Sequence, residues 1–403
     1  MKKVLFSTVL ICLTLSCFFG QTSNDEKQYV IVLSMDAFRW DYDQLVGTPN
    51  LDAISRKGVK AKAFQSSFPT VTFPNHYSMA TGLYPDHHGI ISNTFFNKAL
   101  QKEYKIANYD VVGDPAFYGG EPIWNTAQKQ GVLTANYFWV GSETPINGMH
   151  PNIWKKFDKT VTYSQRIDSV MSWLERPESE RPQLIMFYFE DPDATSHFED
   201  PAYGEKTHLM VKYCDSLVGV LDEKLQALPF AKNIHLLVVS DHGMCPVDST
   251  RAVCLPDYLD TTWIQYSNWS SPMCLMDIYP DKLDSALLIL KNIPHIQAWK
   301  PADVPKRLNF GTNPNIGNLV ILADSAWSLT KTPRPGKSGG AHGFDNLNRD
   351  MYGIFYGYGP KFAKNKVVPE FPNIQLYNII AHLLGIEPVE TDAKLEDVEF
   401  LFE

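Results

Sequence analysis

The sequence predicts an α/β protein whose mostly parallel central sheet is flanked by helices. Four apolar runs rich in β-branched and aromatic residues show no alternation with polar residues, at positions 29–34, 184–189, 234–240 and 319–323. Runs of this kind are typical of parallel strands that are covered on both faces. Helical patterns lie among them at residues 50–57, 203–228 and 282–291. The alternation of strands and helices is what predicts this fold class.

The chain has 403 residues, of which 44% are hydrophobic, and it can therefore bury a large core. We expect a single catalytic domain over residues 21–403. Residues 245–334 are predicted to form an inserted lid or small subdomain, because this stretch is rich in proline and reads as a short β-α-β succession. The formal net charge of −9 would repel a phosphate backbone, which argues against long nucleic acid as a partner. We expect a monomer.

The N-terminus has the pattern of a secretory signal peptide. Lys2 and Lys3 precede an apolar run over residues 4–19, which ends at Gly20. Residues 1–20 are therefore predicted to direct export to the periplasm or cell envelope, and no other run is long and apolar enough for a transmembrane segment in the mature chain. Cys17 leaves a lipoprotein anchor open as an alternative. Export would leave three possible disulfide connectivities among four cysteines: Cys214, Cys245, Cys254 and Cys274.

Carboxylates and imidazoles follow the ends of three predicted strands. In parallel sheets ligands bind at the carboxyl ends of the strands, so these side chains are expected to meet in one place. A glycine-rich segment at residues 339–343 contributes another histidine. The resulting set holds three carboxylates and three imidazoles without a thiolate: Asp36, Asp193, His197, Asp241, His242 and His342. Six nitrogen and oxygen ligands suit two zinc ions, and such a pair suits in-line displacement at phosphorus.

A nucleophile is expected where residues 68–82 pass from a predicted strand, at residues 59–64, into a helix. Thr72 would present its hydroxyl at the helix N-terminus, where anions are favoured. The alternative is that Thr72 only caps the helix.

The sequence resembles the nucleotide pyrophosphatase/phosphodiesterase family of the alkaline phosphatase superfamily. The matching motifs are Thr-Phe-Pro-Asn-His-Tyr at residues 72–77 and further segments at 81–85, 88–91, 120–124, 138–142, 190–193, 241–244 and 340–343. They cover nearly the whole mature chain and resemble the compact bacterial catalytic form, without the additional modules of animal members. The resemblance implies an alkaline-phosphatase-like fold.

The resemblance also implies roles for individual residues. Thr72 would be the nucleophile and Thr70 would not. Asn93, with the backbone N–H of Phe73, would bind a phosphate oxygen. Phe73 and Phe157 would cover the two faces of a nucleotide base, and Trp139 would lie beside it. Asp193, His197 and His342 would hold one zinc, while Asp36, Asp241 and His242, with Thr72 beside them, would hold the other.

The expected activity is hydrolysis of nucleotide phosphodiester and pyrophosphate bonds to nucleoside 5′-monophosphates through a covalent threonine intermediate. Two departures leave substrate preference open, since Val71 stands where the family commonly has lysine and Val140 where it commonly has proline. A choline or lysophospholipid-type phosphodiesterase, or a phosphomonoesterase, on the same two-metal site is the alternative. The basic segment at residues 331–337 is either a surface loop or a contact to substrate phosphates. A metal-bound but inactive envelope protein is disfavoured, because no ligand is missing.

Overall fold

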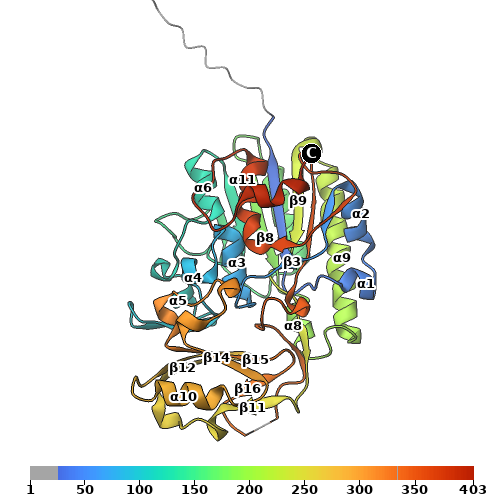
Figure 1. The fold of residues 1–403 in the computed structure, drawn as a ribbon. Helices are drawn as coiled ribbons and strands as arrows, with labels where there is room; N and C mark the ends of the chain where they lie inside the picture. Colours follow the sequence, from blue (N-terminus) through green and yellow to red (C-terminus); the bar gives the residue numbers. More distant parts are fainter. Residues whose placement is uncertain (1–25, 334) are drawn as a thin grey trace, which may run out of the picture.

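The protein is built around one eight-stranded sheet in a computed structural model that describes residues 26–333 and 335–403 (Figure 1). Only β18 runs against its neighbours, and every other pairing in this sheet is parallel. The predicted mostly parallel sheet is therefore confirmed. The strands in spatial order are β19 (Lys366–Val368), β2 (Val59–Ala61), β18 (Phe355–Tyr358), β9 (Ile234–Val239), β1 (Tyr29–Met35), β8 (Leu184–Phe189), β6 (Thr134–Tyr137) and β7 (Ile153–Lys155).

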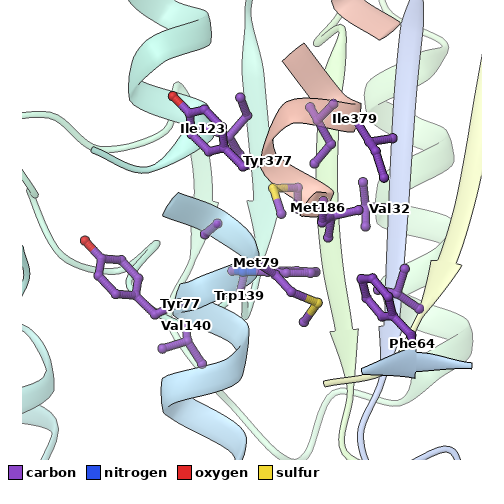
Figure 2. Packing of buried hydrophobic residues seen from close by; sticks show 14 of the residues in the cluster. Val32, Phe64, Tyr77, Met79, Ile123, Trp139, Val140, Met186, Tyr377 and Ile379 are labelled. Atoms are coloured by element: carbon purple, nitrogen blue, oxygen red, sulfur yellow. The ribbon is translucent and has the colours of Figure 1, made fainter. Parts of the chain in front are cut away.

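Helices cover both faces of this sheet, as the apolar strands require. In β1, Val30 and Val32 face one hydrophobic cluster, whereas Ile31 and Leu33 face another. The first cluster includes side chains of α3 (Thr72–Thr81), α6 (Ile123–Lys129) and α11 (Leu376–Leu384). The second includes side chains of α2 (Pro49–Lys57), α7 (Tyr163–Leu174) and α9 (Glu205–Gln226). Figure 2 shows the first cluster, where Val32 and Met186 of the sheet lie near Met79 and Ile379.

The predicted insert contains a second, antiparallel sheet with its own core, which lies below the main sheet in Figure 1. Its strands in spatial order are β12 (Ile264–Ser270), β13 (Met273–Ile278), β15 (Leu319–Ala323) and β14 (Ile296–Trp299). Helix α10 (Leu283–Leu290) packs in this core. The pair formed by β11 (Ala252–Cys254) and β16 (Ser328–Thr330) also lies in the insert. β10 (Cys245–Val247) pairs with β17 (Gly339–Ala341), which lies beyond residue 334. The boundaries 245–334 remain a prediction.

One strand prediction was wrong in its placement. Residues 319–323 form β15, but this strand pairs antiparallel with β13 and β14 and does not belong to the central sheet. Val320 and Leu322 pack against the main core, whereas Leu319, Ile321 and Ala323 pack in the core of the insert. Because both faces of β15 are covered, its apolar run cannot be told from that of a central parallel strand.

The remaining short elements connect these layers, and the predicted strand at residues 59–64 is divided between β2 and β3. They are α1 (Tyr42–Val46), α4 (Pro85–His88), α5 (Tyr109–Val112), α8 (Asp193–Ser196), β3 (Phe64–Gln65), β4 (Thr94–Asn97), β5 (Lys102–Lys105) and β20 (Phe371–Pro372). Within residues 26–333 and 335–403, no helix is both long and apolar enough to cross a membrane. The predicted signal peptide and Cys17 lie outside the described residues. Cys214, Cys245, Cys254 and Cys274 are all free thiols.

Candidate active site and metal centre

The predicted metal ligands converge where three neighbouring strands end. β9, β1 and β8 lie side by side in the sheet and run parallel. Asp36 follows β1, Asp241 and His242 follow β9, and Asp193 begins α8 just after β8. The ligand atoms of Asp36, Asp241 and His242 all lie within 4.8 Å of one another, and the three residues are buried. The trio therefore has the compactness that a metal ion requires.

A second group consists of Asp193, His242 and His342, again within 4.8 Å. The prediction had His197 in this group in place of His242. His197 lies beside it, with Nε2 3.3 Å from Asp193 Oδ1, and the His242 and His342 rings stack with their centroids 3.9 Å apart. All six predicted ligands are thus brought together, while their division between two ions remains a prediction.

The three histidines are oriented alike. In each ring Nδ1 lies beside a backbone carbonyl oxygen: Gly340 at 3.0 Å for His197, Gly243 at 2.9 Å for His242, and Thr70 at 3.1 Å for His342. Hydrogen bonds from Nδ1–H to these carbonyls would leave Nε2 as the free acceptor, and this is how proteins commonly fix a metal-binding imidazole. The ring orientations therefore fit metal binding through Nε2.

The carboxylates also fit a cation. Tyr188 donates a hydrogen bond to Asp36 Oδ2 at 2.5 Å, and the backbone N–H of Ala37 donates to Asp241 Oδ1 at 3.2 Å. Asp36 Oδ1 is buried and accepts no hydrogen bond from any described residue. Asp241 Oδ2 is also buried, with His76 Nδ1 and His242 Nε2 at 3.3 and 3.2 Å. Burial, followed by the nearby Asp241 and Asp193 carboxylates, raises the pKa of Asp36 well above its usual value. Positive charge at this point would relieve that repulsion.

Two threonines near the centre have different surroundings. Thr72 is the first residue of α3, and its Oγ1 lies 3.3 Å from His242 Nε2. The helix is capped at Val71, so Thr72 is not the N-cap. Thr70 is fully buried, and its hydroxyl donates to Phe344 O at 2.9 Å and accepts from the N–H of Gly343 at 3.1 Å. Thr72 is therefore the threonine with a hydroxyl available at the candidate metal centre.

Asn93 and the N–H of Phe73 lie together, while their predicted role in binding a phosphate oxygen remains a prediction. The Phe73 N–H donates to Asn93 Oδ1 at 3.0 Å. A phosphate oxygen that used this N–H would have to replace the side-chain oxygen of Asn93 as its acceptor. The Asn93 amide nitrogen carries two further donors.

An apolar cavity of about 380 Å³ opens beside Thr72. Phe73, Phe157 and Trp139 line it, so all three predicted base-binding residues lie in one cavity. Trp139 is 1% exposed, and its Nε1–H donates a hydrogen bond to His76 O at 3.0 Å. Its ring is therefore held in place and forms part of the cavity wall. Phe157 is partly buried and meets Phe138 edge to face, with ring centroids 5.1 Å apart.

The same cavity contains residues that sequence reasoning missed. Tyr188 lines it and holds Asp36, and Glu143 lines it a few residues after β6. Tyr188 is a hydroxyl-bearing residue in an otherwise apolar strand, which is a signal that sequence inspection could have used. Nothing in the sequence marks Glu143, because its position depends on how the segment after β6 turns.

A second and more polar cavity, of about 590 Å³, also borders the candidate metal centre. Asn93, His197 and His342 line one part of it. The insert lines the rest with hydroxyl groups of Ser270, Ser271, Ser328 and Thr330, and residue Lys337 lies beside them. Lys337 Nζ lies 2.9 Å from His197 Nδ1.

Comparison with known proteins assigns the chain to a known family. The family described as "Type I phosphodiesterase / nucleotide pyrophosphatase" matches residues 30–345. The chain belongs to this family, which confirms the resemblance seen in the sequence.

The similar proteins include a venom phosphodiesterase of Crotalus durissus collilineatus, 33% identical over 91% of this chain and 45% of that protein. Ectonucleotide pyrophosphatase/phosphodiesterase family member 3 of Rattus norvegicus is 32% identical over 89% of this chain and 42% of that protein. The chain thus spans less than half the length of these two relatives.

Among solved structures, murine ectonucleotide pyrophosphatase/phosphodiesterase 5 superposes with a TM-score of 0.88. It is 28% identical, and the match covers 93% of this chain and 100% of that chain. A further structure of the murine enzyme, inactivated by a threonine-to-alanine substitution and in complex with AMP, also has a TM-score of 0.88, at 27% identity. The predicted alkaline-phosphatase-like fold class is confirmed.

Proposed function

We propose that the protein is a two-zinc phosphodiesterase that hydrolyses nucleotide phosphodiester and pyrophosphate bonds and releases nucleoside 5′-monophosphates. One observation carries the proposal: Thr72 lies between a cluster of six candidate metal-ligand side chains and a cavity lined by aromatic rings. A phosphate bound at the cluster would have its nucleoside in that cavity. The AMP complex of the murine relative supports this assignment.

The reaction has two displacements at phosphorus. Bound zinc would supply positive charge near the attacking and leaving oxygens and lower the pKa of the Thr72 hydroxyl. Thr72 Oγ1 loses its proton to solvent and attacks in line, so that an Oγ1–P bond forms while the bond to the leaving oxygen breaks and that oxygen keeps the electron pair. Water then attacks the same phosphorus. The Oγ1–P bond breaks, Thr72 regains a proton, and the nucleoside monophosphate leaves.

The two cavities suggest how a substrate lies across the centre. The aromatic cavity beside Phe73 and Phe157 suits a base, because stacking on an aromatic ring stabilises any base. The second cavity, with its hydroxyl groups and Lys337, suits a polar or anionic leaving group such as pyrophosphate or a second nucleotide. Asn93 lies at the edge of this second cavity, where its amide can donate to a phosphate oxygen.

One observation favours a choline-type or lysophospholipid phosphodiesterase as the second candidate. Glu143 and several aromatic side chains line the same cavity, and an acidic, aromatic cage is how proteins hold quaternary ammonium groups. A phosphomonoesterase remains a third possibility on the same metal centre.

Substrate profiling tests the proposal. The purified protein would be assayed on nucleoside triphosphates, dinucleotides, p-nitrophenylphosphorylcholine and a phosphomonoester. We expect the highest kcat/KM for nucleotides, with the nucleoside monophosphate as a product. A preference for the choline ester, or for the monoester, would refute the nucleotide assignment.

We also propose that the protein is exported to the periplasm or cell envelope and acts as a monomer. The signal-peptide pattern at residues 1–20 supports export. The relatives are named venom and ecto-enzymes, which is consistent with an exported enzyme. Mass determination of the mature chain would test whether residues 1–20 are removed and whether a lipid is attached at Cys17.

A further inference from the structure

Arg166 is a buried arginine that lines neither of the two cavities. It belongs to α7 and is 1% exposed. Its guanidinium nitrogens donate to Val161 O at 3.0 and 3.2 Å, to Tyr188 O at 2.7 Å, and to the two carboxylate oxygens of Glu190 at 2.5 and 2.9 Å. A guanidinium group has five N–H donors in a rigid plane, so Arg166 holds these acceptors in a fixed arrangement.

One side of this arrangement leads to a predicted metal ligand. Glu190 lies in the short segment that joins β8 to α8, and Asp193 is the first residue of α8. The pair between Arg166 and Glu190 is bidentate, which fixes its geometry as well as adding stability. Tyr163 of α7 supports the same segment, because its hydroxyl donates to Asp191 Oδ2 at 2.8 Å. Helix α7 therefore holds the segment that leads to Asp193.

The other side leads to the aromatic cavity. The guanidinium carbon of Arg166 lies 4.7 Å from the centroid of the Phe138 ring. Phe138 lines the cavity and packs edge to face against Phe157. Its φ of +67° lies in the left-handed region, which a bulky residue rarely adopts. Such a backbone conformation persists only where the surroundings hold it, and the guanidinium group over the ring is one of the contacts that do so.

We propose that Arg166 is a positioning residue that couples the aromatic cavity to the metal-ligand segment. Through Glu190 it keeps the Asp193 carboxylate in place for a metal ion, and through Phe138 it keeps the ring wall in place for a base. It acts through these residues and does not touch the substrate, because it lines neither cavity. The inference rests on the proposed zinc-dependent nucleotide function.

The test is Arg166→Lys, which keeps the charge. A lysine cannot pair with both oxygens of Glu190 at once, and it has no planar group to lie over Phe138. A chelator titration of the zinc-loaded protein should release the first zinc ion at about ten-fold lower chelator concentration than in the wild type. With zinc in excess, kcat should fall about ten-fold both for the p-nitrophenyl ester of AMP and for bis(p-nitrophenyl) phosphate. KM should rise about five-fold for the AMP ester alone, since only this substrate has a base.

Two further variants separate the two sides. Glu190→Gln keeps an acceptor oxygen but loses the charged bidentate pair. It should ease the release of zinc and lower kcat on both substrates, with little change in the KM of the AMP ester. Phe138→Leu should raise this KM and leave the release of zinc unchanged. Arg166→Lys alone should show both effects together.

A matched control is Arg181→Lys. Arg181 is also stacked on aromatic rings, with its guanidinium carbon 3.9 Å from the Phe230 centroid and 5.5 Å from that of Tyr29. Tyr29 is the first residue of β1, at the opposite end of this strand from Asp36. Arg181→Lys should lower the melting temperature without changing zinc release, kcat or KM. The melting temperature of every variant is measured, so that a loss of stability alone is recognised.

The outcomes that overturn the inference differ from those that overturn the proposed function. If Arg166→Lys melts earlier but keeps the zinc release and the KM of the wild type, Arg166 only supports the fold. A change in one of these two quantities without the other would show that Arg166 does not couple the two sides. If Arg166→Lys does not fold, unchanged zinc release in Glu190→Gln or an unchanged KM in Phe138→Leu overturns the inference. A wild-type protein that binds no zinc, or that prefers p-nitrophenylphosphorylcholine, would instead contradict the proposed function.

Discussion

The two cavities that meet at the candidate metal centre differ in chemistry and in origin. The aromatic cavity is built by segments of the main domain, including α3 and the stretch after β6. The polar cavity has its hydroxyl wall on the insert, from the end of β12 and from β16. Under the proposed function, the main domain would hold the nucleoside, whereas the insert would contact the leaving group. Substrate preference can change on one side without changing the other.

The candidate metal centre borders both cavities, with Asp36 and Asp193 in the lining of one and His197 and His342 in the lining of the other, so loss of the metal should affect every substrate. We expect elemental analysis to find about two zinc ions per chain. Chelation should lower turnover of all substrates by about three orders of magnitude or more. His342→Ala should lose part of the zinc, because His342 Nε2 faces Asp193 Oδ1 at 3.5 Å.

The control for this prediction is His295→Ala. His295 stacks on Trp327 in the insert, away from the metal-ligand set, and its loss should leave the zinc content unchanged. A single ion per chain, or activity that requires only magnesium, would contradict the two-zinc proposal.

Thr72, the proposed nucleophile, lies at the candidate metal centre, so its loss should also affect every substrate. Thr72→Ala should lower turnover by about 10⁴-fold or more with the zinc retained, because no other group would form the covalent intermediate. Thr72→Ser should keep partial activity. The measurement is kcat on a nucleoside triphosphate and on a base-free diester.

Thr70→Ala is the comparison variant. Thr70 bonds Gly343 and Phe344, next to His342, and we expect a lower melting temperature with a much smaller loss of turnover. Equal losses at the two threonines would mean that Thr72 is not the nucleophile.

Much of this centre could be predicted from the sequence, because its ligands follow strand ends at short and fixed distances. Asp36 and His242 could be predicted from the positions of β1 and β9 alone. His342 was found through its glycine-rich surroundings and the family resemblance. The candidate metal ligands can thus be recognised from their local positions in the sequence. Only their division between two ions depends on how the histidine rings pack.

Other parts of the fold and of the candidate site could not be predicted from the local sequence. β15 has the apolar pattern of a central strand, yet the pairing with β13 and β14 decides its sheet. Glu143 lies in a connecting segment, and its position depends on how the chain turns between it and Phe157. For Lys337, the sequence left open whether the basic segment 331–337 is a surface loop or a phosphate contact, and only the fold brings its Nζ to 2.9 Å from His197 Nδ1. Such contacts follow from the assembled fold and leave no local pattern.

The aromatic cavity can be tested separately through Phe157. Phe157→Ala should weaken the binding of nucleotides by about ten-fold, since stacking on an aromatic ring stabilises a bound base by roughly 1–3 kcal/mol. The effect should appear mainly in KM and should be smaller for a base-free diester. Phe96→Ala is a matched control, because Phe96 packs against Tyr266 and does not line the cavity. Equal losses on both substrates would instead mean that Phe157 supports the fold.

The smallest expected effect concerns the polar cavity and Lys337. If His197 Nδ1 donates its proton to Gly340 O, it cannot also accept from Lys337, and the ammonium group is then free to meet an anion. Lys337→Ala should lower kcat/KM about five-fold for ATP, whose leaving group is pyrophosphate, and less for the p-nitrophenyl ester of AMP. Lys331→Ala is the matched control, since Lys331 lies over the Trp269 ring and does not line the cavity. Equal losses on both esters would show that Lys337 acts through His197, and the insert would then have no part in selecting the leaving group through this lysine.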